Sequence, residues 1–454
     1  MKRATFGTRF GFYMAAVGAA FGLGTLWRFP YITGVNGGGA FVLLYIFFVG
    51  AISLPALISE LMLGKLSRRG MIGALSHKAW IKERGSAYWK WFGALGMIAA
   101  FIVLSYYTVI SGWVIHFIIQ AVSGHFTDLA SKPENIIDRL LVHGYLQILL
   151  ASVHLIITTS IVAQGVREGI EKSSRIFMPI LFIIMLFLIV HSLFLPGATE
   201  ALRFLFYPNF SKLTATAVIE ALGHALFTLS LGFGAMVAYG SYLEDKTHLP
   251  SEAIFVTGID VLLSLCAGIL IFPIVFSAHV DSGTGPALLF KTMPVLFRQL
   301  TFGYLVGVAF FVCLYFAALS ASIALFEGLV TYLIDQKKLG RPLASYIIAG
   351  VTFLLALVSA FSGSIFRNVK VGERGLLEII DQVIINWTLP IVAFGLVLFV
   401  SLCIPIEEKK SAFVDQKSLV SVRLFPTWII AIKYIVPGLI LAAFMIQILI
   451  WLFS

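Results

Sequence analysis

Long, continuous apolar runs are the feature that most limits what this chain can fold into. Eleven of them are spread along its 454 residues, centred near residues 20, 52, 106, 153, 184, 228, 266, 317, 353, 393 and 440. A helix needs about 20 mainly apolar residues to cross the hydrocarbon core of a bilayer. A β-barrel would need alternating rather than continuous apolar residues. We therefore predict an all-α membrane protein with eleven transmembrane helices.

Charged residues are few and unevenly distributed. They make up only 12% of the chain, too few to cover the surface of a soluble domain of this size. With a cytoplasmic N-terminus, 21 basic residues fall in inside segments and 9 in outside loops, as expected for membrane topology. The net charge of +10 therefore reports topology, and we expect no nucleic-acid partner. An odd number of spans places the C-terminus outside, and we expect no cleavable signal peptide.

Two glycine-interrupted segments begin the two halves of the chain. Gly18, Gly22 and Gly24 interrupt the first apolar segment, and Gly232 and Gly234 interrupt the sixth. Paired broken helices indicate a transporter with inverted repeats and a binding site near the bilayer midplane. We predict a single transporter domain over residues 1–454, with repeats at 10–195 and 214–404 and a peripheral eleventh helix at 427–453.

A break in a membrane helix frees N–H and C=O groups that are costly to leave unpaired. A zwitterion and a cation together satisfy both kinds of group, and Thr228 and Ser230 add hydroxyls near the second break. Ionisable residues inside the spans are further candidates, because charge is costly at that depth. They are Arg28, Glu60, Asp260, Glu327 and Asp381. Packing is the competing role for Glu60, Asp260 and Glu327, and we interpret His224 as a hydrogen-bonded packing residue.

Enzymatic and metal-site signatures are missing from the sequence. It has no Ser-His-Asp arrangement, no phosphate-cradling loop and no metal-ligand spacing of His, Cys and Glu. Its three cysteines, Cys266, Cys313 and Cys403, fall in or beside apolar segments without paired spacing, which indicates apolar fillers. We therefore expect no enzyme.

Six stretches of the chain resemble the neurotransmitter:sodium symporters, which have the LeuT-type fold. In chain order they are RFGFYMAAVGAAFGLGTLWRFPYITGVNGGGAF (9–41), SYYTVISGW (105–113), GIEKSSRIFMP (169–179), FTLSLGFGAMVAYGSY (227–242), FAALSASIALFE (316–327) and LEIIDQVIINWTLP (377–390). They follow the family order, cover essentially the whole chain, and eleven spans suit the bacterial branch. The resemblance implies sodium-driven symport of an amino acid across a bacterial inner membrane by alternating access. It also implies a monomer or weak dimer, with one or two Na⁺ ions and no organic cofactor.

The resemblance implies a substrate site between the two broken helices. The substrate carboxylate would meet the amides near Leu23 and Gly24 and the hydroxyl of Tyr107. The implied site residues are Ala19, Ala20, Leu23, Gly24, Val103, Tyr107, Ile110, Phe227, Thr228, Ser230, Phe233, Ala321 and Leu325. Because the lining has no charge to pair with an ionised side chain, an apolar or aromatic amino acid is favoured.

The same resemblance implies two sodium sites and two gates. Sodium site one would use the Ala20 carbonyl, Thr25, Thr228, Asp260 and the substrate carboxylate. Sodium site two would use the carbonyls of Gly18, Phe21 and Ala317 and the hydroxyl of Ser320. The outer gate would be Arg28 with Asp381, capped by Phe233. The inner gate would be Arg3 with Asp335, near Ser241 and Tyr242.

Three positions depart from the family pattern. Thr25 stands where asparagine is usual, and Ala321 stands where a second hydroxyl serves site two, so one-sodium or proton coupling stays open. Asp260 replaces a common asparagine near the positions that hold Cl⁻ in chloride-dependent relatives. Those positions match Tyr45, His224, Thr228, Asp260 and Ser264. A fixed carboxylate makes Cl⁻ redundant, so we predict chloride-independent transport.

Two further hypotheses stay open at this point. Asp260, with His224, is a candidate proton acceptor on the return step of the cycle. A transport-inactive amino-acid sensor is the alternative from another functional class.

Overall fold

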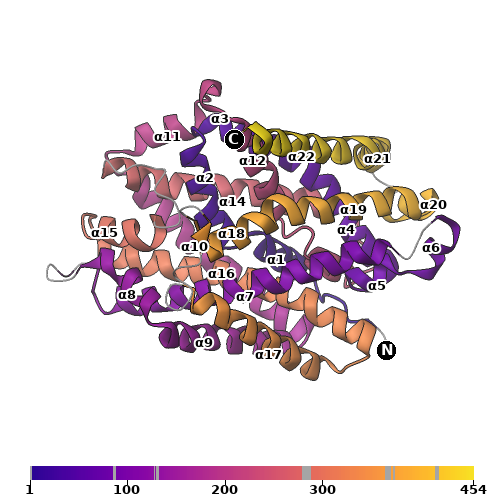
Figure 1. Ribbon diagram of the computed structural model, residues 1–454, viewed down its shortest axis with the longest axis horizontal. Coiled ribbons are helices and arrows are strands. Elements are labelled where there is room, and N and C mark those ends of the chain that lie inside the picture. Colours follow the sequence, from indigo (N-terminus) through magenta and orange to yellow (C-terminus); the bar gives the residue numbers. More distant parts are fainter. Residues whose placement is uncertain are drawn as a thin grey trace.

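The described structure is a bundle of helices that run roughly lengthwise (Figure 1). It is a computed structural model that describes residues 3–84, 88–126, 128, 132–278, 288–362, 370–371, 374–414 and 419–453. The only strands among these residues are β1 (Lys370–Val371) and β2 (Arg374–Gly375), an antiparallel pair. The predicted all-α class is confirmed.

Most helices are long, and several contain short π-helical or 3₁₀ stretches. The first half holds α1 (Arg9–Ala20), η1 (Gly24–Arg28), α2 (Phe29–Val35), α3 (Gly39–Phe48), η2 (Val49–Ser53), α4 (Leu54–Ser67), α5 (Met71–Leu75), α6 (Lys78–Arg84), α7 (Trp89–Val122), η3 (Pro133–Asn135), α8 (Ile136–Val142), α9 (Gly144–Ala163), η4 (Val166–Glu171), α10 (Lys172–Leu193), α11 (Ala198–Phe206) and η5 (Phe210–Lys212). The second half holds α12 (Ala215–Thr228), α13 (Ala235–Gly240), α14 (Leu249–Ser277), η6 (Leu288–Thr292), α15 (Met293–Phe297), α16 (Gly303–Lys337), α17 (Arg341–Ala360), α18 (Leu376–Val383), η7 (Ile384–Thr388), α19 (Leu389–Cys403), α20 (Ile406–Phe413), α21 (Leu419–Ile430), η8 (Ala431–Ile435) and α22 (Val436–Phe453).

Nine helices in the described part of the chain are long and apolar enough to cross a membrane. The first predicted segment makes a tenth if α1 and the η1–α2 helix count as one span, bent by 47°. The sixth predicted segment is divided into α12 and α13, which are each too short to qualify. The count of eleven spans therefore stays a prediction.

The break in the first segment follows α1. Phe21 leaves the helix with φ −85° and ψ 83°, and helical structure resumes at Gly24. Thr8 starts α1 by accepting a hydrogen bond from the N–H of Gly11, which satisfies one of the free amides of the first turn. The sequence GAAFGLG thus ends one helix and begins another within a few residues.

The break in the sixth segment lies between α12 and α13. Gly232 and Gly234 adopt φ of 81° and 80°, a left-handed conformation that glycine reaches without a steric penalty. Glu60, on α4, supports this break by accepting a 2.7 Å hydrogen bond from the N–H of Gly232. The glycines predicted to break the helix therefore take the conformations that break it.

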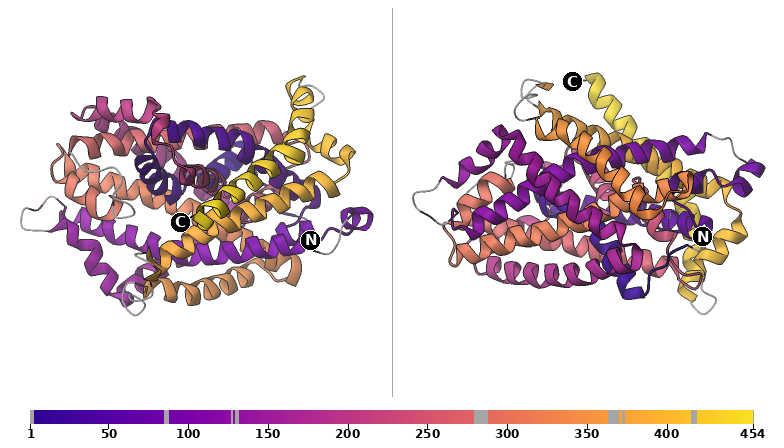
Figure 2. Two further views of the ribbon diagram at one scale, coloured as in Figure 1. Left: turned by 45° about the horizontal axis from the view of Figure 1, so that its top comes forward. Right: turned by 90° about the horizontal axis from the view of Figure 1, so that it is seen from below.

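Burial separates the central helices from the outer ones. In their most apolar windows α7 and α16 are each 72% buried, whereas the η4–α10 and α21–α22 spans are 28% and 33% buried. The last span lies at the edge of the bundle, along α12 and α19 (Figure 2). The two broken helices therefore lie in a scaffold centred on α7 and α16.

The two ends of the bundle differ in what closes them. The N-terminus lies with α5, α6 and α20 at one end, called here the N-terminal end, and α8 and α15 lie at the opposite end (Figure 1). The segment at that opposite end, residues 281–298, is described from residue 288 onward. Its described part, η6 and α15, turns inward, and Phe290 packs edge-on against Trp27 and Trp113 at ring-centroid distances of 6.0 and 5.9 Å.

Candidate functional site between the two helix breaks

A small cavity lies between the two helix breaks, walled on its other sides by α7 and α16. It measures about 20 Å³ and is lined by Ala19, Ala20, Gly22, Gly24, Tyr107, Phe227, Thr228, Ser230, Phe233, Ala321 and Leu325. Ten of the thirteen predicted site residues are in this set. A cavity of this size has room for about one water. In this conformation an amino acid fits only after the walls move apart.

Three predicted residues do not line the cavity, and one lining residue was not predicted. Leu23, Val103 and Ile110 lie outside the lining set, although all three are buried. The unpredicted residue is Gly22, where a Cβ atom would lie 2.7 Å from the Tyr107 hydroxyl and 2.8 Å from the Ala321 Cβ. Glycine is needed there for close approach, and its place in the GAAFGLG motif was the available signal.

Two hydrogen bonds hold the polar groups of this cavity. The N–H of Leu23 donates to the Tyr107 hydroxyl at 2.7 Å. The hydroxyl of Ser230 donates to the carbonyl of Ala19 at 2.7 Å and so links the two breaks. Because the Tyr107 oxygen accepts the Leu23 bond, its own O–H can donate to an anion in the cavity.

Three oxygen-bearing side chains gather beside the cavity. The hydroxyl oxygens of Thr25 and Thr228 are 3.2 Å apart, and Thr228 donates to Asp260 at 2.8 Å. Asp260 is fully buried, and no Lys or Arg nitrogen of the described chain lies within 4.0 Å of its carboxylate. A carboxylate in such a place requires a cation or a proton. Thr228 also lines the cavity, so this cluster adjoins it.

The residues predicted to match a chloride neighbourhood surround the same carboxylate. The Tyr45 hydroxyl lies 3.2 Å from Asp260 Oδ2 and 3.1 Å from Ser264 Oγ. His224 packs differently from the prediction: neither of its ring nitrogens has a hydrogen-bond partner among the described residues. Its ring lies 5.8 Å from that of Phe29 and 5.3 Å from that of Tyr45, and this aromatic packing replaces the expected hydrogen bond.

The residues of the second predicted sodium site come from α1 (Gly18), the break after it (Phe21) and α16 (Ala317 and Ser320). A Cβ atom at Gly18 would lie 3.0 Å from the Ser320 Cβ, so the two helices are in close contact there. The Ser320 hydroxyl bonds to the carbonyls of Phe316 (2.9 Å) and Ala317 (3.1 Å) in its own helix. Ala321 faces the central cavity instead.

The two residues of the predicted outer gate are in contact. Arg28 and Asp381 form an ion pair at 2.5 Å, and their side chains are 16% and 29% exposed. Tyr106 was not predicted, yet its hydroxyl donates to the other oxygen of Asp381 at 2.8 Å. Phe233, the predicted cap of this gate, lines the cavity, is 1% exposed and packs edge-on against Phe227.

The residues of the predicted inner gate, at the N-terminal end, are in contact as well. Arg3 forms an ion pair with Asp335, donates to Ser241 at 2.7 Å, and lies 4.9 Å above the ring of Tyr242. The second oxygen of Asp335 accepts the N–H of Gly70 at 2.6 Å. These contacts join the N-terminal segment to the end of α13 and to α16.

A buried ion pair that the sequence did not indicate extends this inner network. Arg341 binds both oxygens of Glu327, at 2.7 and 2.9 Å. Tyr242 donates to the same carboxylate, and its hydroxyl lies 2.8 Å from that of Thr331. Glu327, on α16, therefore links the turn after α13 to α17. Nothing in the sequence around Arg341 marked it as the partner.

Comparisons with known proteins agree over nearly the whole chain. The chain matches the sodium:neurotransmitter symporter family over residues 3–132 and 130–452. It is 35% identical to the uncharacterized sodium-dependent transporter YhdH of Bacillus subtilis (strain 168), covering 98% of this chain and 97% of that protein. An uncharacterized sodium-dependent transporter of Haemophilus influenzae is 32% identical over 98% of both chains. Among solved structures, that of MhsT in complex with L-phenylalanine is similar, with a TM-score of 0.89, 32% identity, and coverage of 98% of this chain and 99% of that one.

Proposed function

This chain belongs to the sodium:neurotransmitter symporter family, a family of membrane transporters and not of enzymes, and from that premise we propose that it is a sodium-coupled symporter of an apolar or aromatic amino acid. The observation that carries the proposal is the cavity between the two helix breaks, with the Thr25–Thr228–Asp260 cluster beside it. Thr228 both lines the cavity and belongs to the oxygen cluster, so the groups that would bind the substrate carboxylate lie next to the oxygens that would bind the cation. A sodium ion held by this cluster attracts the substrate carboxylate, so the two bind together.

The substrate class follows from the chemistry of the lining. The residues that would face the substrate side chain are Phe227, Phe233, Ala321 and Leu325, with the Ser230 hydroxyl already bonded to Ala19. None of them offers a counter-charge to an acidic or basic side chain, whose burial without one is costly. The similar protein MhsT was solved with L-phenylalanine, which makes this amino acid the first one to test.

Uptake into proteoliposomes tests the proposal directly. Labelled L-phenylalanine and a set of apolar amino acids would be supplied with an inward sodium gradient, with choline replacing sodium in the control. We expect accumulation above equilibrium only with the gradient. Sodium-dependent binding without accumulation would instead support an amino-acid sensor, and accumulation driven equally by a proton gradient without sodium would support proton coupling.

Chloride independence is the second part of the proposal. Asp260 supplies a buried negative charge within hydrogen-bond distance of Tyr45 and Thr228, where a bound Cl⁻ would be repelled. We expect uptake to be unchanged when gluconate replaces chloride at constant sodium, and we expect Asp260→Asn to make uptake chloride-dependent. Ser264→Ala is the matched control, because it alters the same neighbourhood without removing the charge. Native uptake that falls in gluconate would refute this part.

The return step and the second sodium ion are proposals about coupling. Asp260 would take up a proton after sodium leaves, and Asp260→Asn would then abolish proton countertransport. His224 makes no hydrogen bond to this carboxylate, so the proposal rests on Asp260 alone. Site two would have the Ser320 hydroxyl as its one side-chain ligand, so we propose a weaker second site and a coupling ratio of one or two Na⁺.

Topology and assembly complete the proposal. We place the protein in a bacterial inner membrane with eleven spans, the N-terminus in the cytoplasm and the C-terminus outside. The α12–α13 pair would form the span that length alone does not identify. Substrate and lipid are its partners, and we propose a monomer or weak dimer with no organic cofactor.

A further inference from the structure

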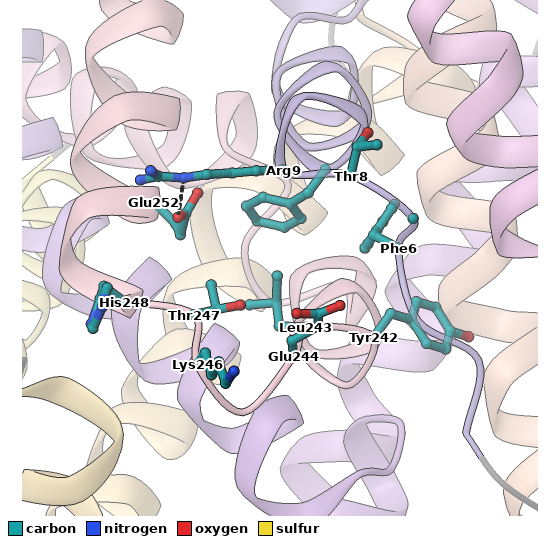
Figure 3. A pocket seen from close by; sticks show the side chains of 12 residues that line it. Phe6, Thr8, Arg9, Tyr242, Leu243, Glu244, Lys246, Thr247, His248 and Glu252 are labelled. Atoms are coloured by element: carbon teal, nitrogen blue, oxygen red, sulfur yellow. Dashed lines mark hydrogen bonds and ion pairs between the residues drawn. The ribbon is translucent and has the colours of Figure 1, made fainter.

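A second and much larger cavity lies at the N-terminal end, away from the site just described. Its volume is about 260 Å³, against about 20 Å³ for the central cavity. One wall is the N-terminal segment from Phe6 to Arg9 with Phe12, and the opposite wall is the loop from Tyr242 to His248 (Figure 3). While both gates are closed, this cavity has room for an amino acid, and the central one does not.

A charged pair of opposite signs stands on one side of the cavity. Arg9 donates its Nε–H to a carboxylate oxygen of Glu252 at 2.8 Å, and Figure 3 shows this pair above the loop residues. The Arg9 side chain is 64% exposed, and its guanidinium also lies over the Tyr13 ring, 5.3 Å from the ring centre. Glu252 is 2% exposed, and its second carboxylate oxygen has no hydrogen-bond partner among the described residues. A carboxylate accepts about four hydrogen bonds, so this one has unused capacity.

The arrangement of these charges matches a zwitterion. An α-amino acid carries its ammonium and carboxylate groups on one carbon, so it needs an acceptor and a cationic donor side by side. Glu252 and Arg9 provide them from adjacent positions, in contact with each other. Phe6 and Phe12, both buried, provide an apolar surface for a side chain. An anion alone would be repelled by Glu252, and a simple cation by Arg9.

The two walls belong to the parts that the inner gate holds together. The N–H of Phe6 donates to the carbonyl of Tyr242 at 3.2 Å, and their rings pack edge-on at 6.2 Å. Arg3, three residues earlier, binds Asp335 and Ser241. Opening this gate must separate the N-terminal segment from the loop. A molecule that bridges Arg9, in the N-terminal segment, and Glu252, on α14 directly after the loop, therefore stabilises the closed gate.

We infer that this cavity is a second amino-acid site, in which the carboxylate of the zwitterion pairs with Arg9 and its ammonium group with Glu252, and that the bound molecule holds the inner gate closed. The ligand class rests on the proposed function, since the molecule that accumulates on the N-terminal side is the transported amino acid. Occupancy then slows transport as the internal concentration rises. The site contains none of the oxygen groups of the sodium cluster, so its binding does not require sodium.

Equilibrium binding separates the two sites by their sodium dependence. Labelled L-phenylalanine would be titrated onto the purified full chain in sodium and in choline. We expect one sodium-dependent site and one that persists in choline. Glu252→Gln and Arg9→Gln should each weaken the choline site about tenfold or more, because each removes a charge-assisted hydrogen bond. Glu244→Gln is the matched control, since it neutralises an exposed carboxylate at the same cavity.

Retention of sodium-dependent binding shows that each variant is folded. If the native chain showed no sodium-dependent binding but still bound L-phenylalanine in choline, the proposed function would be refuted and this inference would stand. The inference fails if the native chain binds nothing in choline, or if Glu244→Gln has the same effect as Glu252→Gln. It also fails if phenethylamine or 3-phenylpropionate competes as well as L-phenylalanine does, because a zwitterion site rejects both.

A transport measurement tests the regulatory consequence. Initial uptake would be measured into proteoliposomes whose lumen does or does not contain unlabelled L-phenylalanine, using protein oriented by a selective label. We expect luminal L-phenylalanine to slow native uptake severalfold and to have no slowing effect on Glu252→Gln. Equal slowing of both proteins would assign the effect to the central site and overturn the gating role.

Discussion

The hydroxyl of Tyr107 offers the sharpest test of the central site. It is buried and accepts the N–H of Leu23 at 2.7 Å, so its own hydrogen is available to donate to the proposed substrate carboxylate. Tyr107→Phe removes a hydrogen bond to a charged group, which contributes about 1.5–3 kcal/mol, and leaves the Leu23 amide without its partner. Each 1.4 kcal/mol is a tenfold change in affinity, so we expect sodium-dependent binding to weaken roughly tenfold to a hundredfold.

The adjacent tyrosine provides a matched control. Tyr106 has the same side chain one position earlier, but its hydroxyl donates to Asp381 in the outer gate. Tyr106→Phe should change the dissociation constant for L-phenylalanine by less than about threefold, since it lacks contact with the proposed site. Calorimetric titration in sodium measures both variants, and their thermal unfolding checks the fold. Equal effects of the two substitutions, or no effect of Tyr107→Phe, would refute the assignment of this hydroxyl to the substrate.

Three further predictions concern the gates and the second break. Arg28→Gln removes a partly buried ion pair. We expect it to destabilise the closed outer gate by about 1 kcal/mol, to open the outer vestibule and to reduce uptake at least fivefold. Chemical labelling of a cysteine introduced on the η6–α15 side would measure the opening, and unchanged labelling would contradict it. Arg3→Gln removes the contacts to Asp335 and Ser241. We expect cysteine labelling to rise at the N-terminal end and sodium-dependent binding to weaken. A rise of labelling at the opposite end would exclude an inner gate at Arg3. Gly232→Ala places a Cβ at φ 81°, which should cost about 1–2 kcal/mol and lower the thermal stability, whereas Gly350→Ala, in an open position of α17, should not.

The sequence by itself determined the class of the protein and the positions of its helix breaks. Continuous apolar runs leave helices as the way to satisfy the backbone in a membrane, so the class follows from composition and length. Gly232 and Gly234 mark a break because few other residues adopt their conformation at low cost. Most of the cavity lining was implied by the family resemblance: eight of its residues lie beside the breaks, and Tyr107, Ala321 and Leu325 come from α7 and α16.

Only the tertiary structure decided which side chains meet across helices. Tyr106 and Tyr107 are identical, adjacent residues. The packing of α7 directs Tyr106 to the outer gate and Tyr107 to the cavity. Arg341 finds Glu327 because α16 and α17 pack together, and His224 lies between aromatic rings instead of bonding to its neighbours. The large cavity beside Arg9 and Glu252 likewise depends on how the N-terminal segment settles against a distant loop. These contacts join residues of different elements, from 14 positions apart for Arg341 and Glu327 to 275 for Tyr106 and Asp381, so no local pattern in the sequence encodes them.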